Sequence, residues 1–397
     1  MQDTIRTHRH TDEKPFLVIW EVTQACDLAC LHCRASAMPS AHPEALTRSE
    51  GEKLLRDIAD FGKPHPLVVF TGGDPFKRND LFDLIAYSRE LGLHSGVSPS
   101  ATPLLTLENL RRAREAGATT VSLSLDAPRP SGHDRFRGVE GSYQRTLQGC
   151  DWVREAGLKL QINTTVTRFN LEDLAELAAL VYQQRVMTWS LFSLVPTGRA
   201  QPAHALTAEE VEAVMHFLVD VSQYIPLKTT EGHHFKRVLL MRQLLSQAGK
   251  DWRTALQVDP LYERLQSRWQ RHVEQLGAEP RAAARRRPLH LNSGQGFVFI
   301  SHLGHVFPSG FLPIRAGNVR QQSLKEIYQD SPLFRSLREP RFYNGRCGRC
   351  EFRDLCGGSR SRAYAVSGDP LGEDPACAYQ PGSFPLSLEP QPVAVAQ

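Results

Sequence analysis

The hydrophobic pattern of the chain from Phe16 to about Pro196 alternates between short apolar runs and longer amphipathic stretches. The runs are rich in β-branched and aromatic residues, which is typical of strands, while the stretches between them have helical periodicity. Alternating strands and helices predict an α/β fold with a parallel sheet covered by helices. The six expected strands are 16–23, 67–73, 93–98, 119–126, 158–166 and 188–195, and the expected helices are 49–61, 80–91, 107–116, 143–156 and 171–184.

Six strand–helix units fit either a partial barrel or a doubly wound sheet, and the pattern does not separate the two. In both architectures the functional residues gather at the carboxyl ends of the strands. Polar residues stand at three of these ends, in 71–74, 98–100 and 124–126. We therefore expect the site at this edge of the sheet.

The remainder of the chain has a different pattern. Helical periodicity returns in 207–224, 235–249 and 262–276, around a polar segment at 228–237. A hairpin is expected at 297–310, with Leu303-Gly304-His305 as its turn, and a helix at 323–328. A proline-rich tail ends the chain.

Composition narrows the class of protein. A hydrophobic fraction of 41% and a charged fraction of 23% are typical of a globular chain with a large core. The net charge of +4 is too small to favour nucleic acid as the main partner. No apolar run approaches the roughly 18 residues of a membrane helix. The first residues carry acids and no apolar block, so we expect neither a secretory signal nor a membrane anchor.

Eight cysteines in 397 residues are too few for a disulfide scaffold, but they are clustered. Cys26, Cys30 and Cys33 follow the first expected strand with the spacing C-x3-C-x2-C. Three thiolates on one loop can bind three metals of a polynuclear cluster and leave one metal open for chemistry. Zinc would require a fourth ligand, and His32 is too close to Cys33 to serve easily. The spacing favours an iron–sulfur cluster, with zinc and unligated thiols as alternatives.

This cysteine motif, placed after the first strand of six strand–helix units, resembles that of the radical S-adenosylmethionine (SAM) superfamily, with His32 at the usually aromatic position. The resemblance implies an enzyme of oxidoreductase or lyase type, built on a partial (βα)6 TIM-like barrel. It implies a [4Fe–4S] cluster whose open iron binds the methionine amine and carboxylate of S-adenosylmethionine. Reductive cleavage of that cofactor gives a 5′-deoxyadenosyl radical, which abstracts hydrogen from the substrate.

The same resemblance assigns residues to the cofactor. The segment 71–75 resembles the family's Gly-Gly-Glu-Pro element, in which glycines allow close backbone approach, although Asp74 replaces the glutamate. In the family, a serine ends the fourth strand and an arginine follows the sequence His-Asp-x-Φ. Ser124 and Arg137 stand at these two positions here. Ser100, Asn163 and Thr165 are weaker candidates. The residues expected to bind the cofactor are Gly72, Gly73, Asp74, Ser98, Ser124, Asp126, Arg137 and His32.

A second cysteine group lies near the end of the chain, with the spacing Cys347-x2-Cys350-x5-Cys356-x20-Cys377. Four thiolates fit one four-iron cluster or one zinc ion. Beside a radical SAM core, the group resembles the C-terminal SPASM or twitch extension, which holds auxiliary [4Fe–4S] clusters. Ser309 and Arg360 stand where the two-cluster form has cysteines, which implies one auxiliary cluster. Cys150 is left over, and we expect it to be a small buried hydrophobic residue.

The whole pattern predicts four parts: an N-terminal tail (1–15), a radical SAM partial barrel (16–200), a helical and loop segment shaping the substrate site (201–290), and a SPASM/twitch-like auxiliary cluster domain with a tail (291–397). The resemblance is greatest to the subgroup of alternative haem and haem d1 biosynthesis. It implies oxidative decarboxylation or another side-chain modification of a tetrapyrrole. Candidate substrate contacts are Arg34, Arg360, Arg362, His233 and His234.

Two other functions stay open at this point. The chain could be a SPASM-type maturase of a ribosomally made peptide, although its segment before the barrel is short for a peptide-binding wing. It could also be a zinc-binding interaction protein without enzymatic activity. For the radical enzyme, we expect flavodoxin or ferredoxin as electron donor and a reducing, cytoplasmic location.

Overall fold

The computed structural model describes residues 11–281 and 288–388. The expected N-terminal tail (1–15) therefore lies largely outside the described residues, as does the end of the C-terminal tail. Within the described ranges no helix is long and apolar enough to cross a bilayer.

One open sheet of ten strands organises the chain, in the order β10-β9-β8-β1-β2-β3-β4-β5-β6-β7. Strands β1 to β7 are parallel to one another, and β8 is parallel to β1. Strands β9 and β10 continue the sheet in antiparallel pairs. The strands are β1 (Leu17–Thr23), β2 (Leu67–Gly72), β3 (Ser95–Val97), β4 (Ala118–Ser124), β5 (Lys159–Val166), β6 (Thr188–Ser193), β7 (Leu227–Thr230), β8 (Phe297–Ile300), β9 (His305–Phe307) and β10 (Gly317–Asn318).

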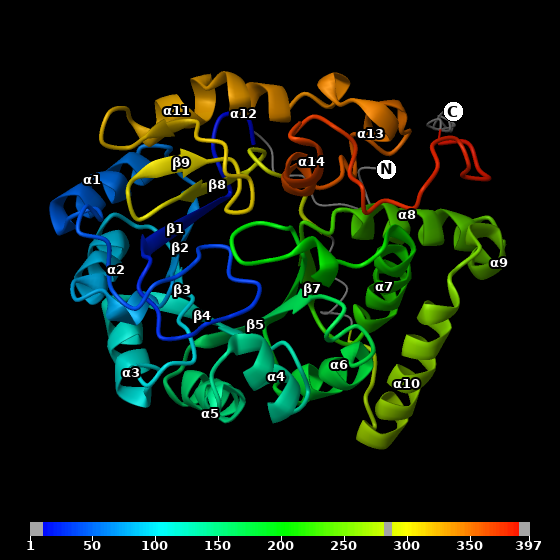
Figure 1. The fold of residues 1–397 in the computed structure, drawn as a ribbon, viewed down its shortest axis with the longest axis horizontal. Helices are drawn as coiled ribbons and strands as arrows, with labels where there is room; N and C mark the ends of the chain where they lie inside the picture. Colours follow the sequence, from blue (N-terminus) through cyan, green and yellow to red (C-terminus); the bar gives the residue numbers. More distant parts are fainter. Residues whose placement is uncertain (1–10, 282–287, 389–397) are drawn as a thin grey trace, which may run out of the picture.

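Helices surround the curved sheet on its outer side, which gives a partial barrel (Figure 1). The α/β fold class is thereby confirmed. The helices of the barrel and its extension are α1 (Arg48–Ala59), α2 (Leu81–Glu90), α3 (Leu107–Ala116), α4 (Pro130–Arg137), α5 (Ser142–Glu155), α6 (Leu174–Gln183), α7 (Ala208–Val221), α8 (His234–Gln247), α9 (Trp252–Leu256) and α10 (Pro260–Leu276). The C-terminal helices are α11 (Leu324–Asp330), α12 (Pro332–Leu337), α13 (Gly345–Arg349) and α14 (Arg360–Ser367).

Two of the elements that the hydrophobic pattern does not predict are β7 and α4. Strand β7 lies in the segment expected to be polar loop, and it pairs only with β6 at the edge of the sheet. An edge strand needs less apolar surface than a central one, so its Leu-Lys-Thr-Thr sequence suffices. Helix α4 has a charged sequence and is bounded by local signals, since Pro130 starts it and Gly138 ends it in the left-handed conformation.

The C-terminal hairpin belongs to the barrel sheet. Strand β8 pairs in register with β1, from Leu17 opposite Phe297 to Trp20 opposite Ile300. The boundaries expected at 200 and 290 therefore fall between strands of one continuous sheet. Because β1 also leads into the first cysteine segment, this pairing fixes the C-terminal part beside it.

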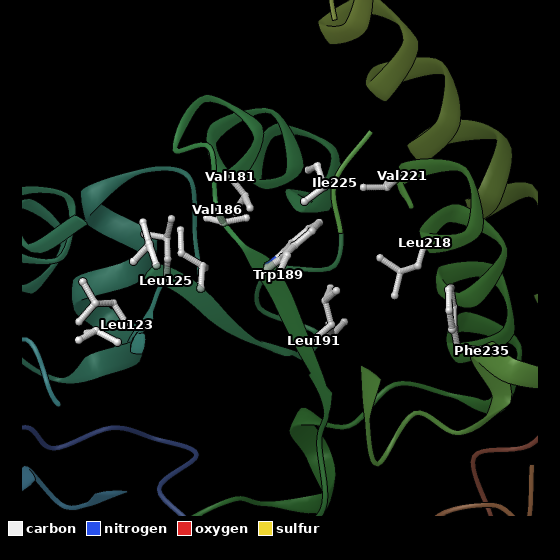
Figure 2. Close-up of a cluster of buried hydrophobic side chains, with 14 of the residues drawn as sticks. Leu123, Leu125, Val181, Val186, Trp189, Leu191, Leu218, Val221, Ile225 and Phe235 are labelled. Atoms are coloured by element: carbon white, nitrogen blue, oxygen red, sulfur yellow. The ribbon is translucent and has the colours of Figure 1, made fainter. Parts of the chain in front are cut away.

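A large apolar cluster packs β4 and β6 against the helices outside them (Figure 2). Trp189 lies near its centre, with Val186, Leu191 and Ile225 around it. Its ring is fully buried, and its Nε1 donates to Thr164 Oγ1 at 2.9 Å. The cluster therefore joins these strands to the helices beside them.

Replacing Trp189 with alanine should lower the free energy of unfolding by about 3–5 kcal/mol, because a buried ring is exchanged for a cavity. The urea midpoint of unfolding measures this change. Phe342→Ala is a matched control, since that side chain is 47% exposed and its loss should cost less than about 0.5 kcal/mol. Equal effects of the two substitutions would show that Trp189 does not support the core.

Candidate active site

The first cysteine segment is a loop that follows β1 and is held by backbone hydrogen bonds. Cys26 N donates to Met38 O at 2.7 Å, which closes the loop on itself. Leu31 N donates to Phe136 O at 3.0 Å and so ties the loop to α4. Cys26 and Cys30 are buried, and Cys33 is partly exposed. The three thiols are therefore presented from one fixed loop.

Gly72 and Gly73 lie against this loop. A Cβ at Gly72 would come within 2.4 Å of Thr23 O, and one at Gly73 within 2.4 Å of Ala25 O. Gly73 N also donates to Thr23 O at 2.9 Å. Both glycines are thus required by close packing of two backbones, in addition to any approach of a cofactor.

A cavity of about 210 Å³ lies at the carboxyl ends of the strands, with the three thiols in its wall. Of the residues expected at the cofactor, six line it; they are His32, Gly72, Gly73, Ser98, Ser124 and Arg137. The weaker candidates Ser100, Asn163 and Thr165 line it as well. No aspartate or glutamate of the described chain lines the cavity, so its charged wall is cationic.

Asp74 and Asp126, the other two residues expected to bind the cofactor, do not line this cavity. Asp74 is buried and accepts a hydrogen bond from Thr102 Oγ1 at 2.6 Å, and it caps the short helix Pro75–Lys77. Asp126 pairs with Arg137 and accepts from Thr165 N at 2.8 Å. Each carboxylate supports a residue of the cavity wall and is not part of the wall.

Polar groups lie close to the sulfur atoms of the first cysteines. Arg137 Nη1 lies 3.7 Å from Cys30 Sγ, and Leu28 N lies 3.4 Å from Cys26 Sγ. Burial raises the pKa of the Cys26 thiol, and the hydrogen bond from Leu28 opposes that shift. Burial, together with the nearby Arg137, lowers the pKa of His32 to about 3. His32 is therefore neutral, and it stacks on Phe136 with ring centroids 4.2 Å apart.

Further residues of the wall went unnoticed in the sequence. Phe192, Arg199 and Phe311 line the cavity. The turn after β6 carries Gly198, whose Cβ would come within 2.3 Å of Cys33 O. A Pro-x-Gly-Arg sequence directly after a strand was the available signal for this turn.

The four C-terminal cysteines line one small cavity, together with His234, Arg237 and Asp374. Cys347 comes from α13, and His234 and Arg237 come from the start of α8, so two distant segments form this pocket. Backbone N–H groups of Phe352 and Asp374 each lie 3.4 Å from a cysteine sulfur. Among the described residues no three Cys, His, Asp or Glu side chains form a group that could hold a single metal ion. A four-iron cluster has a different requirement, because each thiolate binds a different iron.

Two buried cations near this pocket make no ion pair within the described residues. Arg360 is fully buried and donates from Nη2 to Cys347 Sγ at 3.5 Å. Lys236 is 3% exposed and donates to Leu291 O at 3.4 Å. Burial lowers the pKa of Lys236 to about 8, while Cys356 opposes that shift. A buried charge needs a counter-charge, and a four-iron cluster held by four thiolates would supply negative charge here. The residues therefore fit a four-iron cluster, in which each thiolate binds a different iron.

His234 and Asp374 add a second charged contact to the pocket. His234 Nε2 lies 3.2 Å from Asp374 Oδ2, and both side chains are fully buried. Burial alone would lower the pKa of His234, but Asp374 raises it well above its usual value. Burial alone would raise the pKa of Cys377, but the neighbouring His234 and Arg237 together lower it below its usual value. The pair therefore favours the thiolate form of Cys377.

Of the five expected substrate contacts, one lines the strand-end cavity. Arg34 lines the strand-end cavity, but His233, His234, Arg360 and Arg362 do not. They are buried between the barrel and the C-terminal cysteines. Their sequence positions beside polar and glycine residues suggested exposed loops, whereas all four side chains are buried.

Cys150 is fully buried in α5, and burial raises the pKa of its thiol to about 12. It belongs to the hydrophobic core, as expected for an unreactive cysteine.

Gly73→Ala should destabilise the protein by on the order of 1–3 kcal/mol, because the added methyl group overlaps Ala25 O and Gln24 O. Thermal unfolding of the metal-free protein measures the cost independently of activity. Gly372→Ala is the control, because its nearest neighbour is 3.2 Å away in a surface turn. An unchanged melting temperature in the Gly73 variant would rule out the backbone contact as a constraint.

Arg360→Met should raise the pKa of Cys347. Burial already raises it, and Arg360 opposes that shift. In the metal-free variant, the ultraviolet absorbance of the Cys347 thiolate should therefore appear at a higher pH than in the wild type. After metal loading, the variant should retain less metal per chain. Lys325→Met removes an exposed charge from α11 and should change neither quantity. A titration identical to wild type would contradict the assigned contact.

Comparisons with known proteins agree with this geometry. Residues 20–181 match the Radical SAM superfamily, and residues 292–351 match SPASM, an iron–sulfur cluster-binding domain. The chain is 39% identical to the AdoMet-dependent heme synthase of Oleidesulfovibrio alaskensis, over 94% of this chain and 89% of that one. It is 29% identical to the pre-heme d1 synthase of Dinoroseobacter shibae, over 91% and 85%.

A solved structure shares the fold. Streptococcus suis SuiB bound to the precursor peptide SuiA superimposes with a TM-score of 0.62 at 18% identity, covering 94% of this chain and 76% of that one. The matched domains carry S-adenosylmethionine and [4Fe–4S] clusters as cofactors. The chain is an enzyme of the radical SAM superfamily with a C-terminal SPASM domain, and it belongs to the group that includes the AdoMet-dependent heme synthases.

Proposed function

We propose that this enzyme modifies carboxylate-bearing side chains of an iron tetrapyrrole. The observation that carries the proposal is the strand-end cavity, which combines three thiols and three arginines with no carboxylate among its described lining residues. Such a wall suits an anionic substrate beside the radical-generating cofactor. The chain is 39% identical to the heme synthase of O. alaskensis over 94% of its length, and this similarity supports the same substrate class.

We assign Cys26, Cys30 and Cys33 to the cluster that binds S-adenosylmethionine. Cys347, Cys350, Cys356 and Cys377 are assigned to one auxiliary [4Fe–4S] cluster. The bound cofactor would supply a 5′-deoxyadenosyl radical. Residues 16–200 form the radical SAM part and 291–397 the auxiliary part. In this assignment the segment 201–290 contributes α8 to the auxiliary pocket in addition to shaping the substrate site.

The proposed reaction is an oxidative decarboxylation. Conversion of a propionate side chain to a vinyl group releases CO₂, one hydrogen atom and one electron. S-adenosylmethionine, held beside Cys26, Cys30 and Cys33, would supply the adenosyl group that accepts this hydrogen atom to give 5′-deoxyadenosine. We propose that the auxiliary cluster of this chain takes the electron. The initial reductant would be a flavodoxin or a ferredoxin in a reducing cytoplasm.

A hydrogen-bonded path between the two pockets supports this electron route. Arg362 Nη1 donates to Leu194 O at 3.3 Å, and Leu194 lines the strand-end cavity. The same guanidinium binds Asp374 at 2.8 and 2.9 Å, and Asp374 N lies 3.4 Å from Cys347 Sγ. One buried pair therefore connects the cavity wall to a thiol of the auxiliary pocket.

Anaerobically reconstituted enzyme should contain about eight irons per chain, as two [4Fe–4S] clusters require. With a reductant and S-adenosylmethionine, it should form 5′-deoxyadenosine, and iron-coproporphyrin should increase that yield and lose CO₂. Cys26→Ala should abolish cofactor cleavage, whereas Cys150→Ala should leave it unchanged because Cys150 lies in the core. Liquid chromatography of 5′-deoxyadenosine and mass spectrometry of the porphyrin measure both products.

Other outcomes would point to the competing functions. Cleavage stimulated by a precursor peptide but not by any tetrapyrrole would assign the enzyme to peptide modification. A colourless protein with stoichiometric zinc would contradict the radical enzyme altogether. Intact cleavage in Cys26→Ala would overturn the assignment of the first cysteine loop.

A further inference from the structure

Arg199 differs from the other arginines of the strand-end cavity in the partners of its side chain. Arg34 lies 2.5 Å from Glu21, and Arg137 is paired with Asp126. Arg199 forms no ion pair with any carboxylate of the described residues, and its Nη2 is buried without a hydrogen-bond partner. A buried N–H group left unpaired costs free energy, which a bound anion would recover.

The position of Arg199 is fixed by the first cysteine loop. Its backbone N donates to Cys33 O at 2.9 Å, and its Nε donates to Cys30 O at 3.0 Å. The preceding Gly198 is packed against the same loop so closely that no side chain fits there. These contacts use the backbone N and Nε and leave Nη2 for a ligand. The guanidinium is thus held beside the place where the radical forms.

Two aromatic side chains line the same cavity. The rings of Phe192, at the end of β6, and Phe311, in the turn after β9, have centroids 6.1 Å apart at an angle of 56°. Both are partly exposed. Aromatic rings that line a cavity suit a flat conjugated ligand, which buries area on them and gains stacking contacts.

Resting on the proposed function, we propose that Arg199 binds a carboxylate side chain of the substrate while Phe192 and Phe311 contact its macrocycle. A carboxylate pairs with a guanidinium through short, charge-assisted hydrogen bonds. Anchoring at Arg199 would place that side chain beside the first cysteine loop, where hydrogen abstraction begins. The methionyl carboxylate of S-adenosylmethionine has the same chemistry, so the test must separate the two sources.

The test uses reconstituted holoenzyme carrying Arg199→Gln, Arg199→Lys or Phe311→Ala, with Arg111→Gln as a control on the exposed face of α3. The ligands are iron-coproporphyrin, its tetramethyl ester and S-adenosylmethionine. Soret titrations give the tetrapyrrole affinities, and equilibrium binding gives the cofactor affinity. Iron content and the melting temperature of the metal-free protein report any purely structural effect.

Arg199→Gln should weaken binding of the free acid by roughly 10- to 100-fold and leave the ester nearly unchanged, as expected for loss of a charge-assisted pair. Arg199→Lys should recover part of the affinity. Phe311→Ala should weaken acid and ester alike. Arg111→Gln should behave as wild type in every measurement.

Three results would overturn the proposal. Wild-type affinity of Arg199→Gln for the free acid would exclude the contact. A loss of affinity for S-adenosylmethionine alone would show that Arg199 binds the carboxylate of the cofactor and not that of the substrate. Equal loss of iron and melting temperature in both Arg199 variants would make the residue structural. Failure of the wild type to bind either tetrapyrrole would instead refute the proposed function, and the cofactor affinities would still be measurable.

Discussion

The buried ion pair of Arg362 and Asp374 is the contact on which the two-part site depends. Arg362 is 4% exposed and Asp374 is fully buried, so neither charge is solvated. The guanidinium also binds the carbonyls of Leu194 and Glu231, which come from the turns after β6 and β7. A buried pair contributes little net stability but makes departure from one geometry costly. It therefore fixes how the C-terminal part meets the end of the barrel.

The charges around the auxiliary pocket impose a second constraint. Arg237 is neutralised by Glu212, but Arg360 and Lys236 have no such partner within the described residues. Metal-free protein must keep both cations buried in the neighbourhood of Cys347 and Cys350, whose thiol pKa values are raised by burial. Metal binding would release the thiol protons and pair these charges, so loading of the pocket and stability of the C-terminal part are coupled.

The parts predictable from sequence are those with local signals. Cysteine spacing indicated both pockets, and the periodicity of the hydrophobic residues gave the six barrel strands within about two residues. Pairing of β8 with β1 had no such signal, because a four-residue apolar run does not show which strand it will join. The roles of Asp74 and Arg199 likewise depend on contacts between segments far apart in the chain. His234 could not be placed, because its sequence resembles a solvated turn while α8 carries it into the auxiliary pocket.

A buried carboxylate connects three segments that lie far apart in the chain. Two residues of these segments, Ser309 and Arg360, are the positions where the resemblance to the two-cluster form leads us to expect cysteines. Here Ser309, Ser359 and Ser361 donate to the carboxylate of Glu231, which is 3% exposed. Glu231 has a φ of 56°, a conformation that costs a non-glycine residue energy and persists only where its surroundings require it. The carboxylate joins the turn after β7, the segment after β9 and the start of α14, which is the cross-linking that a metal cluster would provide. Hydrogen bonds to one carboxylate thus hold these three segments together without any metal.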